Sequence, residues 1–251
     1  MNLKGLLLIS CISFSPVLWA DQLSDLKQRA EQGDVSAQTD LGVEYIVGID
    51  VPRDYAQAHK LLLAAAQKGN KLAQYNLGLM YDLGEGVAID KQVAVKWFQK
   101  AAEQGDVPAQ FHMGLMYVHG EGFARHYEEA FKWFQKAAEQ GHTLAQVNLG
   151  LMYVRGEGAA KDLETAVKWF KTAAEKGDMI AQYHLGLSYL EGEGVKKDLS
   201  EAYFWLILSS AKGDQHAHEL INELEADLTA KKITALQKRA SEWNAKFVTK
   251  N

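Results

Sequence analysis

A short sequence element recurs along this chain at a fixed interval of 36 residues, and this regularity constrains the fold more than any other feature. Each occurrence is a glycine followed by a polar residue. The series runs without insertion or deletion through Gly33-Asp34, Gly69-Asn70, Gly105-Asp106, Gly141-His142, Gly177-Asp178 and Gly213-Asp214. A sustained period of this length is typical of repeat architectures, in which each repeat is one supersecondary unit and neighbouring repeats share a core.

Several other columns keep the same 36-residue step. An Ala-Gln pair recurs at Ala37-Gln38, Ala73-Gln74, Ala109-Gln110, Ala145-Gln146 and Ala181-Gln182. A tyrosine column comprises Tyr45, Tyr81, Tyr117, Tyr153 and Tyr189, and a tryptophan column comprises Trp97, Trp133, Trp169 and Trp205, with Leu61 at the first position. Together the columns define five full repeats over residues 37–216, with a half-repeat on either side.

The spacing within one repeat predicts two helices. In residues 72–83, Ala73, Leu77 and Tyr81 stand four apart and share one face of a first helix, here called helix A. Gly78 lies beside them and is expected to let a neighbouring backbone approach. One such pair of helices cannot bury its own apolar face, so the sequence predicts an all-α solenoid in which the repeats stack.

The end of helix A and the start of the next helix are also marked in the sequence. Gly84 and Gly86 are expected to end helix A, because glycine readily adopts the left-handed conformation found at helix C-termini. Asp90 is expected to cap a second helix, helix B, over residues 91–104, with Gly105 ending it. The inward residues of helix B are predicted to be Ala94, Trp97, Phe98, Ala101 and Ala102, so the repeated Trp-Phe pairs are interpreted as core and not as a ligand site.

The motifs carry a family resemblance. The run A-Q-x-x-L-G-x-x-Y-x-x-G-x-G-V at 73–87, followed by D-x-x-x-A-x-K-W-F-x-K-A-A at 90–102, resembles the Sel1-like repeat, a relative of the tetratricopeptide repeat. The first repeat departs from it at Ile49 and Leu61, and the third has His126 in place of the capping aspartate. The resemblance implies a right-handed superhelix with a concave groove that holds other proteins, often at a bacterial envelope or a host surface.

The two ends are expected to cap the array. Residues 21–36 read as a lone helix B with an apolar stripe of Leu23, Leu26 and Ala30, and residues 217–251 as C-terminal capping helices. In the last helix, after Thr229, apolar residues recur at steps of three and four: Ile233, Leu236, Ala240, Trp243 and Phe247. This stripe fits a lid folded back on the fifth repeat; the alternative is a partner-binding helix.

Residues 1–20 have the pattern of a signal peptide, with Lys4 near the start, an apolar core and Ala20 as the preferred last residue before cleavage. Leu18 is larger than the alanine usual three residues before a cleavage site. The alternative is a lipoprotein modified at Cys11, which is disfavoured because an apolar segment follows where a polar tether is expected. The expected location is therefore periplasmic or secreted; a cytosolic scaffold would require residues 1–20 to stay attached.

Composition excludes some partners. The net charge of −5 argues against a nucleic-acid partner, which needs clustered lysine and arginine. The N-terminal apolar run is too short for a permanent membrane span, so no integral membrane span is expected. Cys11 is the single cysteine, and it leaves with the signal peptide, so neither a disulfide nor thiol chemistry is expected in the mature chain.

No catalytic residue, metal or cofactor is predicted. The paired glycines follow a helix and lack the lysine of a phosphate-binding loop. His112, His119 and His126 stand seven apart, roughly 10 Å of helical rise per step, which is too far to share a metal. The alternative of an enzyme that acts on β-lactams or peptidoglycan, as in cysteine-rich relatives, is weakened because the paired cysteines are absent and Ser24-Asp25-Leu26-Lys27 has no companion motifs.

The columns of helix A that vary between repeats predict the binding surface. A helical wheel places positions 75, 76, 79 and 83 opposite the packing side, and position 79 is apolar in every repeat and is expected to pack helix A on helix A. The other three columns contain Tyr, Phe, Asn and His, which can stack on a peptide and hydrogen-bond its backbone. The predicted groove that binds a protein or peptide comprises Tyr75, Asn76, Phe111, His112, His119, Asn148, Arg155, Tyr183, His184 and Glu191. The alternative is a solvated face without a partner.

Overall fold

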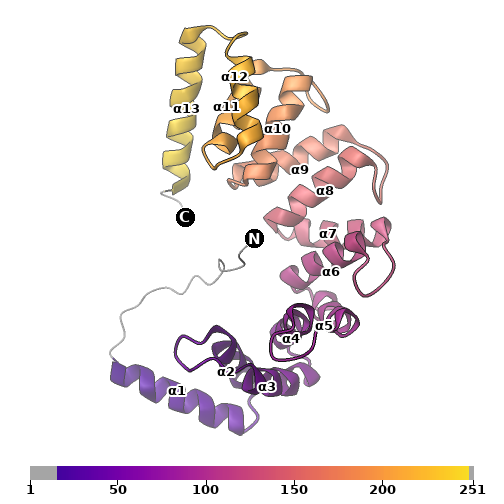
Figure 1. Cartoon of the computed structure of the whole chain (residues 1–251), viewed down its shortest axis with the longest axis vertical. Coiled ribbons are helices and arrows are strands. Elements are labelled where there is room, and N and C mark those ends of the chain that lie inside the picture. Colours follow the sequence, from indigo (N-terminus) through magenta and orange to yellow (C-terminus); the bar gives the residue numbers. More distant parts are fainter. Residues whose placement is uncertain (1–15, 249–251) are drawn as a thin grey trace. The chain divides into compact units, whose positions relative to one another are not determined.

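The computed structural model describes residues 16–248, with side chains for residues 21–246, and this part of the chain forms thirteen α-helices and no strand (Figure 1). The helices are α1 (Pro16–Glu31), α2 (Val35–Val47), α3 (Tyr55–Gln67), α4 (Lys71–Leu83), α5 (Lys91–Glu103), α6 (Val107–His119), α7 (Tyr127–Glu139), α8 (Thr143–Arg155), α9 (Leu163–Glu175), α10 (Met179–Glu191), α11 (Leu199–Ser210), α12 (Gln215–Leu224) and α13 (Ala230–Val248). Two compact units divide the chain after Ile89. Unit 1 contains α1–α4 and unit 2 contains α5–α13, and each is described by itself.

The helices alternate between A and B as the period predicts. Helices α2, α4, α6, α8 and α10 are the five A helices, and α3, α5, α7, α9 and α11 are the five B helices. Asp90 caps α5 as expected, because its Oδ1 accepts hydrogen bonds from the backbone N–H groups of Gln92 and Val93, both at 3.0 Å. His126 does the same for α7 through Nδ1, which accepts from the backbone N–H of Glu129 at 3.4 Å.

Glycines end the A helices. Gly84 follows α4 with φ +74°, in the left-handed region, and its N–H donates to the carbonyl of Met80. Gly86 also has φ +74°, and a Cβ there would lie 2.4 Å from Cβ of Tyr55, so the loop runs too close to α3 for any other residue. The predicted role in ending helix A is confirmed for Gly84, whereas Gly86 serves the packing of the following loop on α3.

At Gly114 and Gly150, the glycine inside helix A makes room for a side chain, while the expectation that Gly78 admits a neighbouring backbone stays a prediction. A Cβ on Gly114 of α6 would lie 2.5 Å from Cε1 of Phe134, and one on Gly150 of α8 would lie 2.6 Å from Cε1 of Phe170. Both phenylalanines come from the B helix that follows in the chain. The pattern Leu-Gly in helix A and Trp-Phe in helix B is therefore one packing device, in which the ring of helix B fits into the gap on helix A.

The Trp-Phe pairs are core residues, as predicted, but the two members differ. Phe98, Phe134 and Phe170 are fully buried. The tryptophans lie nearer the surface, where lysines one turn further along cover two of them: Nζ of Lys100 lies 4.5 Å from the ring centroid of Trp97, and Nζ of Lys136 lies 4.0 Å from that of Trp133.

Both ends pack as caps. In unit 1, Ala30 of α1 is buried with Ala37 and Leu41 of α2, while Leu23 and Leu26 pack against the same cluster. In unit 2, α13 lies along α11 (Figure 1), with Leu236 and Ala240 buried and Ile233 and Trp243 partly buried. Arg239 of α13 also lies over the ring of Phe204 at 3.8 Å and pairs with Glu201. This is the lid arrangement that the apolar stripe predicts; the side chain of Phe247 lies outside the described residues.

Candidate functional site

The candidate site is a face shared by the A helices of unit 2. On each helix, four residues at i, i+4, i+7 and i+11 point the same way, and the outer two are exposed while the inner two are half-buried. We call this set the helix-A face of unit 2. It comprises Pro108, His112, Leu115 and His119 of α6; Leu144, Asn148, Leu151 and Arg155 of α8; and Ile180, His184, Leu187 and Glu191 of α10.

Exposed aliphatic side chains at the start of the A helices are the part of this face that the sequence interpretation missed. Leu144 is 45% exposed and Ile180 is 43% exposed, and the two stand at equivalent positions of α8 and α10. The sequence contains the pattern that identifies these residues, because position 72 and its equivalents stand four residues before the Asn/His column and therefore share its helical face. The column of Leu72 lies on this face, in place of the column of Tyr75 that the helical wheel predicts.

Two predicted groove histidines are stacked on the core. The ring of His112 lies 5.0 Å from that of Phe98 at an interplanar angle of 12°, and the ring of His184 lies 5.1 Å from that of Phe170 at 18°. Burial lowers the pKa of His184 from its ordinary value, and the nearby Arg155 guanidinium lowers it further. His184 therefore presents a neutral, partly covered imidazole to the face.

The asparagines of the same column each donate a side-chain hydrogen bond to the backbone of their own helix. Nδ2 of Asn148 donates to the carbonyl oxygen of Leu144 at 2.8 Å, and Nδ2 of Asn76 donates to that of Leu72 at 2.8 Å. The amide of Asn148 therefore has a fixed orientation before any partner arrives.

Phe111 and Tyr183 lie on the seam between successive A helices and not on the helix-A face. The ring of Phe111 lies 4.6 Å from that of His142, the residue that caps α8, and 5.8 Å from that of Phe134. Tyr183 packs against the core of unit 2, 6.5 Å from the ring of His216, and burial raises its pKa. Both rings contribute mainly to packing.

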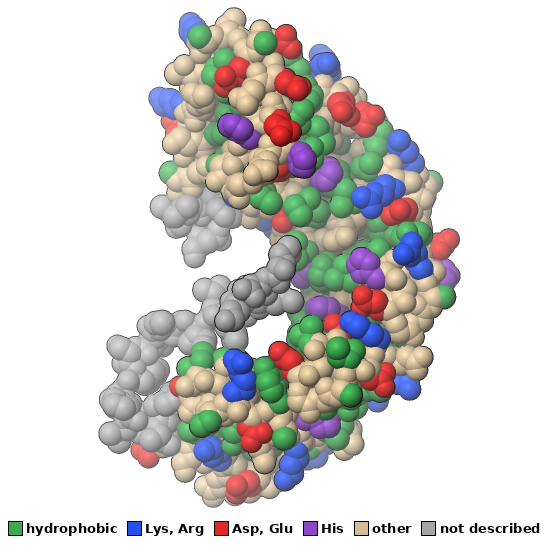
Figure 2. Space-filling view, in the orientation of Figure 1, with side chains coloured by type: hydrophobic (Ala, Val, Ile, Leu, Met, Phe, Trp, Pro, Cys, Tyr) green, Lys and Arg blue, Asp and Glu red, His purple; other side chains and the backbone are tan. Residues whose placement is uncertain are grey.

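The last column of the face carries different charges on its three helices. His119, Arg155 and Glu191 are all exposed, at the C-terminal ends of α6, α8 and α10. Arg155 makes a single long ion pair, with Nη1 at 3.7 Å from Oε2 of Glu157. The face thus combines an aliphatic edge with an edge whose charge changes sign between α8 and α10. Over the surface shown in Figure 2, acidic and basic side chains are intermixed.

Tyr75 and Asn76, the remaining predicted residues, lie on α4 of unit 1 and are half-buried. The structure therefore brings together His112, His119, Asn148, Arg155, His184 and Glu191 on one face of unit 2, and assigns Tyr75 and Asn76 to the other unit.

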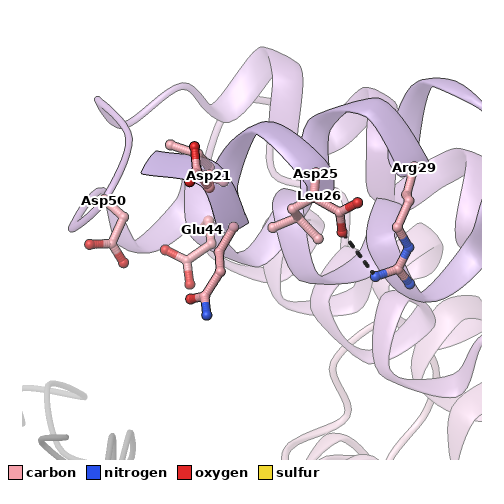
Figure 3. Close-up of a pocket in the computed structure, with 8 residues that line it drawn as sticks. Asp21, Asp25, Leu26, Arg29, Glu44 and Asp50 are labelled. Atoms are coloured by element: carbon pink, nitrogen blue, oxygen red, sulfur yellow. Dashed lines mark ion pairs between the residues drawn. The ribbon is translucent and has the colours of Figure 1, made fainter. Parts of the chain in front are cut away.

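Unit 1 contains an acidic pocket of about 550 Å³ between α1 and α2. Asp21, Asp25, Glu44 and Asp50 surround it, together with Leu23, Leu26, Gln22 and Arg29 (Figure 3). Burial raises the pKa of Glu44, and the neighbouring Asp50 carboxylate raises it further. Arg29 is engaged by Asp25 at 3.7 Å and by Asp34 at 2.9 Å.

Among residues 16–248, no helix is both long enough and apolar enough to cross a membrane. Over the same residues, no three histidine, cysteine or acidic side chains are grouped so that they could hold a metal ion.

Repeated A and B helices with a shared core define this chain as an α-solenoid repeat protein. Its repeats match the Sel1 repeat profile five times, at residues 35–70, 71–106, 107–142, 143–178 and 180–214. The chain belongs to the Sel1 repeat family, whose members are commonly scaffolds for protein–protein interactions. No curated protein sequence matches it significantly.

Solved structures show the same fold. A protective antigen present in uropathogenic Escherichia coli strains, which displays an SLR fold, matches with a TM-score of 0.82 and 36% identity over 92% of this chain and 49% of the antigen. The chain thus spans about half the length of that relative. A Sel1 repeat protein from Oxalobacter formigenes matches with a TM-score of 0.72 and 32% identity, over 89% of this chain and 95% of that one.

Proposed function

We propose that this chain is a non-enzymatic scaffold that is exported to the cell envelope and that binds a peptide or protein segment on the helix-A face of unit 2. The observation that carries the proposal is the pair of exposed aliphatic side chains at equivalent positions, Leu144 and Ile180, beside residues that differ from repeat to repeat. Apolar groups that face solvent next to orienting polar groups are the usual composition of a protein-binding surface.

The polar groups of the face favour a partner segment that carries an acidic and a basic residue in a defined order. Asn148 and His184 are held by the fold, so they can hydrogen-bond a partner without first losing conformational freedom. Arg155 and Glu191 carry opposite charges one repeat apart. A segment with an acidic residue opposite Arg155 and a basic residue opposite Glu191 would be favoured over the same segment in the reverse order.

Binding is preferred to catalysis because the face contains no activated group. A catalytic site needs a nucleophile or an acid–base pair in a cleft. His184 is a titratable group of the face whose pKa is shifted, and its ring is stacked on Phe170.

Export is supported by the signal-peptide pattern of residues 1–20, which lies largely outside the described residues. A relative that is 36% identical is a protective antigen present in uropathogenic Escherichia coli strains, and display to a host fits an exported protein.

Site-specific photo-crosslinking tests the binding face. A crosslinkable amino acid at position 144 or 180 is expected to capture a discrete partner from envelope extracts, and an excess of unlabelled protein should compete. The matched control places the same group at Lys168, which is exposed on the B helix α9. The variant R155E should reduce capture from positions 144 and 180 without lowering stability. Equal capture from position 168 and from the face would contradict the proposal.

A further inference from the structure

The hydrophobic cluster under the N-terminal cap is a smaller version of a cluster in unit 2. In unit 2, Ala138, Ala145 and Leu149 are buried, and the aromatic side chains of the cluster include Phe131, Phe134, Tyr153 and Trp169. Three repeats earlier, the equivalent positions in unit 1 are Ala30, Ala37, Leu41, Leu23, Leu26, Tyr45 and Leu61. Three aromatic rings are thus replaced by leucine, while the two alanines, Leu41 and Tyr45 are unchanged.

One of the replaced residues, Leu61, lines a pocket of about 470 Å³ between α1, α2 and α3. Leu41, Tyr45, Leu61 and Ala64 form its apolar wall. Leu61 stands in the tryptophan column, and Ala64 stands where Lys100 and Lys136 cover the tryptophans of the next two repeats. The first repeat therefore lacks both the indole and the lysine that covers it.

One residue of the pocket lining carries an unsatisfied hydrogen-bond acceptor. Gln38 lines it and is 9% exposed; Nε2 donates to the carbonyl oxygen of Ala30 at 3.1 Å, but the buried Oε1 has no partner among the described residues. A buried acceptor without a donor is costly and is rare in folded proteins.

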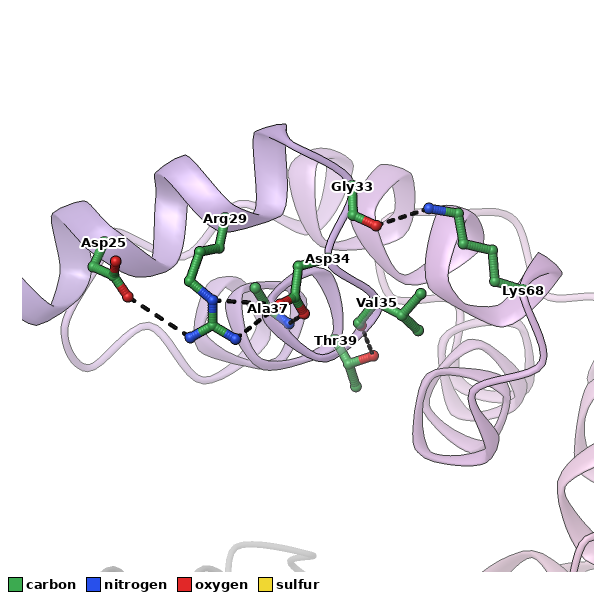
Figure 4. Close-up of polar contacts among 8 residues, drawn as sticks. All are labelled: Asp25, Arg29, Gly33, Asp34, Val35, Ala37, Thr39 and Lys68. Atoms are coloured by element: carbon green, nitrogen blue, oxygen red, sulfur yellow. Dashed lines mark hydrogen bonds and ion pairs between the residues drawn. The ribbon is translucent and has the colours of Figure 1, made fainter.

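The later repeats satisfy this acceptor from the end of helix B. Oε1 of Gln110 accepts from Gln140 at 2.7 Å, and Oε1 of Gln146 accepts from Lys176 at 3.3 Å. In unit 1 the equivalent residue is Lys68, whose Nζ donates to the carbonyl oxygen of Gly33 at 2.8 Å (Figure 4). Lys176 makes the same contact, with Nζ at 2.7 Å from the carbonyl oxygen of Gly141, so unit 1 lacks only the second hydrogen bond of this lysine, the one to the glutamine oxygen.

We propose that this pocket binds the indole of a tryptophan side chain that another protein presents. Its apolar wall occupies the place where the chain's own tryptophans pack, and an indole N–H is the kind of donor that Gln38 lacks. Lys27 and Lys60 also line the pocket, with Glu31, and a lysine over the ring face would reproduce the contact seen at Trp97 and Trp133. The pocket belongs to unit 1, so the inference stands apart from the helix-A face of unit 2.

Titration of the full chain with N-acetyl-tryptophan amide, followed by calorimetry and by the methyl NMR signals of Leu61 and Ala64, tests the proposal. Saturable binding is expected, with N-acetyl-leucine amide at least about tenfold weaker because it buries less apolar area and has no ring donor. Absence of saturable binding by the tryptophan amide, or equal affinity for the two amides, would overturn the proposal.

Refilling the pocket gives the matched test. The double variant L61W/A64K restores the residues of the second and third repeats, and it is expected to weaken tryptophan-amide binding at least about tenfold while the thermal midpoint does not fall. The control I89W adds an indole at a position of unit 1 that is 64% exposed and should bind as the wild type does. If the double variant does not fold, A64L fills the pocket from α3 alone and the same loss is expected. Unchanged affinity in a folded variant would refute the site.

Discussion

At the scale of single residues, His142 connects the stability of unit 2 to pH. Its Nδ1 accepts the backbone N–H of Ala145 at 3.2 Å and so caps α8, where other A helices use aspartate or asparagine. Burial lowers the pKa of His142, and the ammonium of Lys176 lowers it further. Protonation of Nδ1 would remove the cap and place a positive charge at a helix N-terminus.

The pH dependence has a definite sign. Because the pKa of His142 is lower in the folded chain than in the unfolded one, its contribution is complete above the unfolded value of about 6.5 and is lost as the pH falls below it. In H142N the cap does not titrate, so the fall in the free energy of unfolding between pH 7.5 and 5.5 should shrink by a few tenths to ~1 kcal/mol. Urea unfolding at both pH values measures this. An unchanged fall in H142N would show that the cap is not the titrating element.

At the scale of elements, α13 stabilises the last repeat by covering α11. Leu236 is 7% exposed and belongs to the same cluster as Tyr203, Trp205 and Leu206. We expect L236A to lower the free energy of unfolding by about 2 kcal/mol or more, since it leaves a cavity in that cluster. The exposed Lys238 on the same helix provides the control, and K238A should change stability by less than ~0.5 kcal/mol. Equal stabilities of L236A and the wild type would favour the reading of α13 as a helix awaiting a partner.

The elements were largely predictable from the sequence because their determinants are local and repeat together. Asp90 and Gly84 mark helix ends through their own side-chain and backbone chemistry, so their roles follow from position alone. The role of Gly114 could not be deduced, because the ring that fills its gap comes from the next helix. The position of Phe111 could not be deduced for the same reason. This residue of α6 contacts His142, which caps α8, and a helical wheel of one helix cannot show a contact between two helices.

At the scale of the whole molecule, the two proposed surfaces arise from two different kinds of departure from the repeat. The outer positions of the helix-A face of unit 2 are exposed and not constrained by packing, so Leu144, Arg155 and Glu191 can differ between repeats without disturbing the core. The pocket of unit 1 uses core positions instead, where leucine replaces an aromatic ring at Leu61. A replacement at a core position alters the packing, and near Leu61 the buried Oε1 of Gln38 has no hydrogen-bond partner among the described residues.

The state of the N-terminus determines which partners either surface can meet. Helix α1 begins at Pro16, so cleavage after Ala20 would shorten α1 while leaving Leu23, Leu26 and Ala30, the residues that pack in unit 1. We therefore expect protein isolated from the envelope to begin at Asp21 by intact mass and to remain folded. The variant A20R places a large cation where a small residue is needed and should block this processing.

Each other outcome names a different compartment. A chain that retains Met1 would indicate a cytosolic scaffold, and one that begins at a lipid-bearing Cys11 would indicate a membrane-anchored lipoprotein. Both residues lie outside the described part of the chain. A start at Asp21 limits the partners of the helix-A face and of the tryptophan pocket to proteins of the envelope or the cell exterior, and a start at Met1 would exclude them.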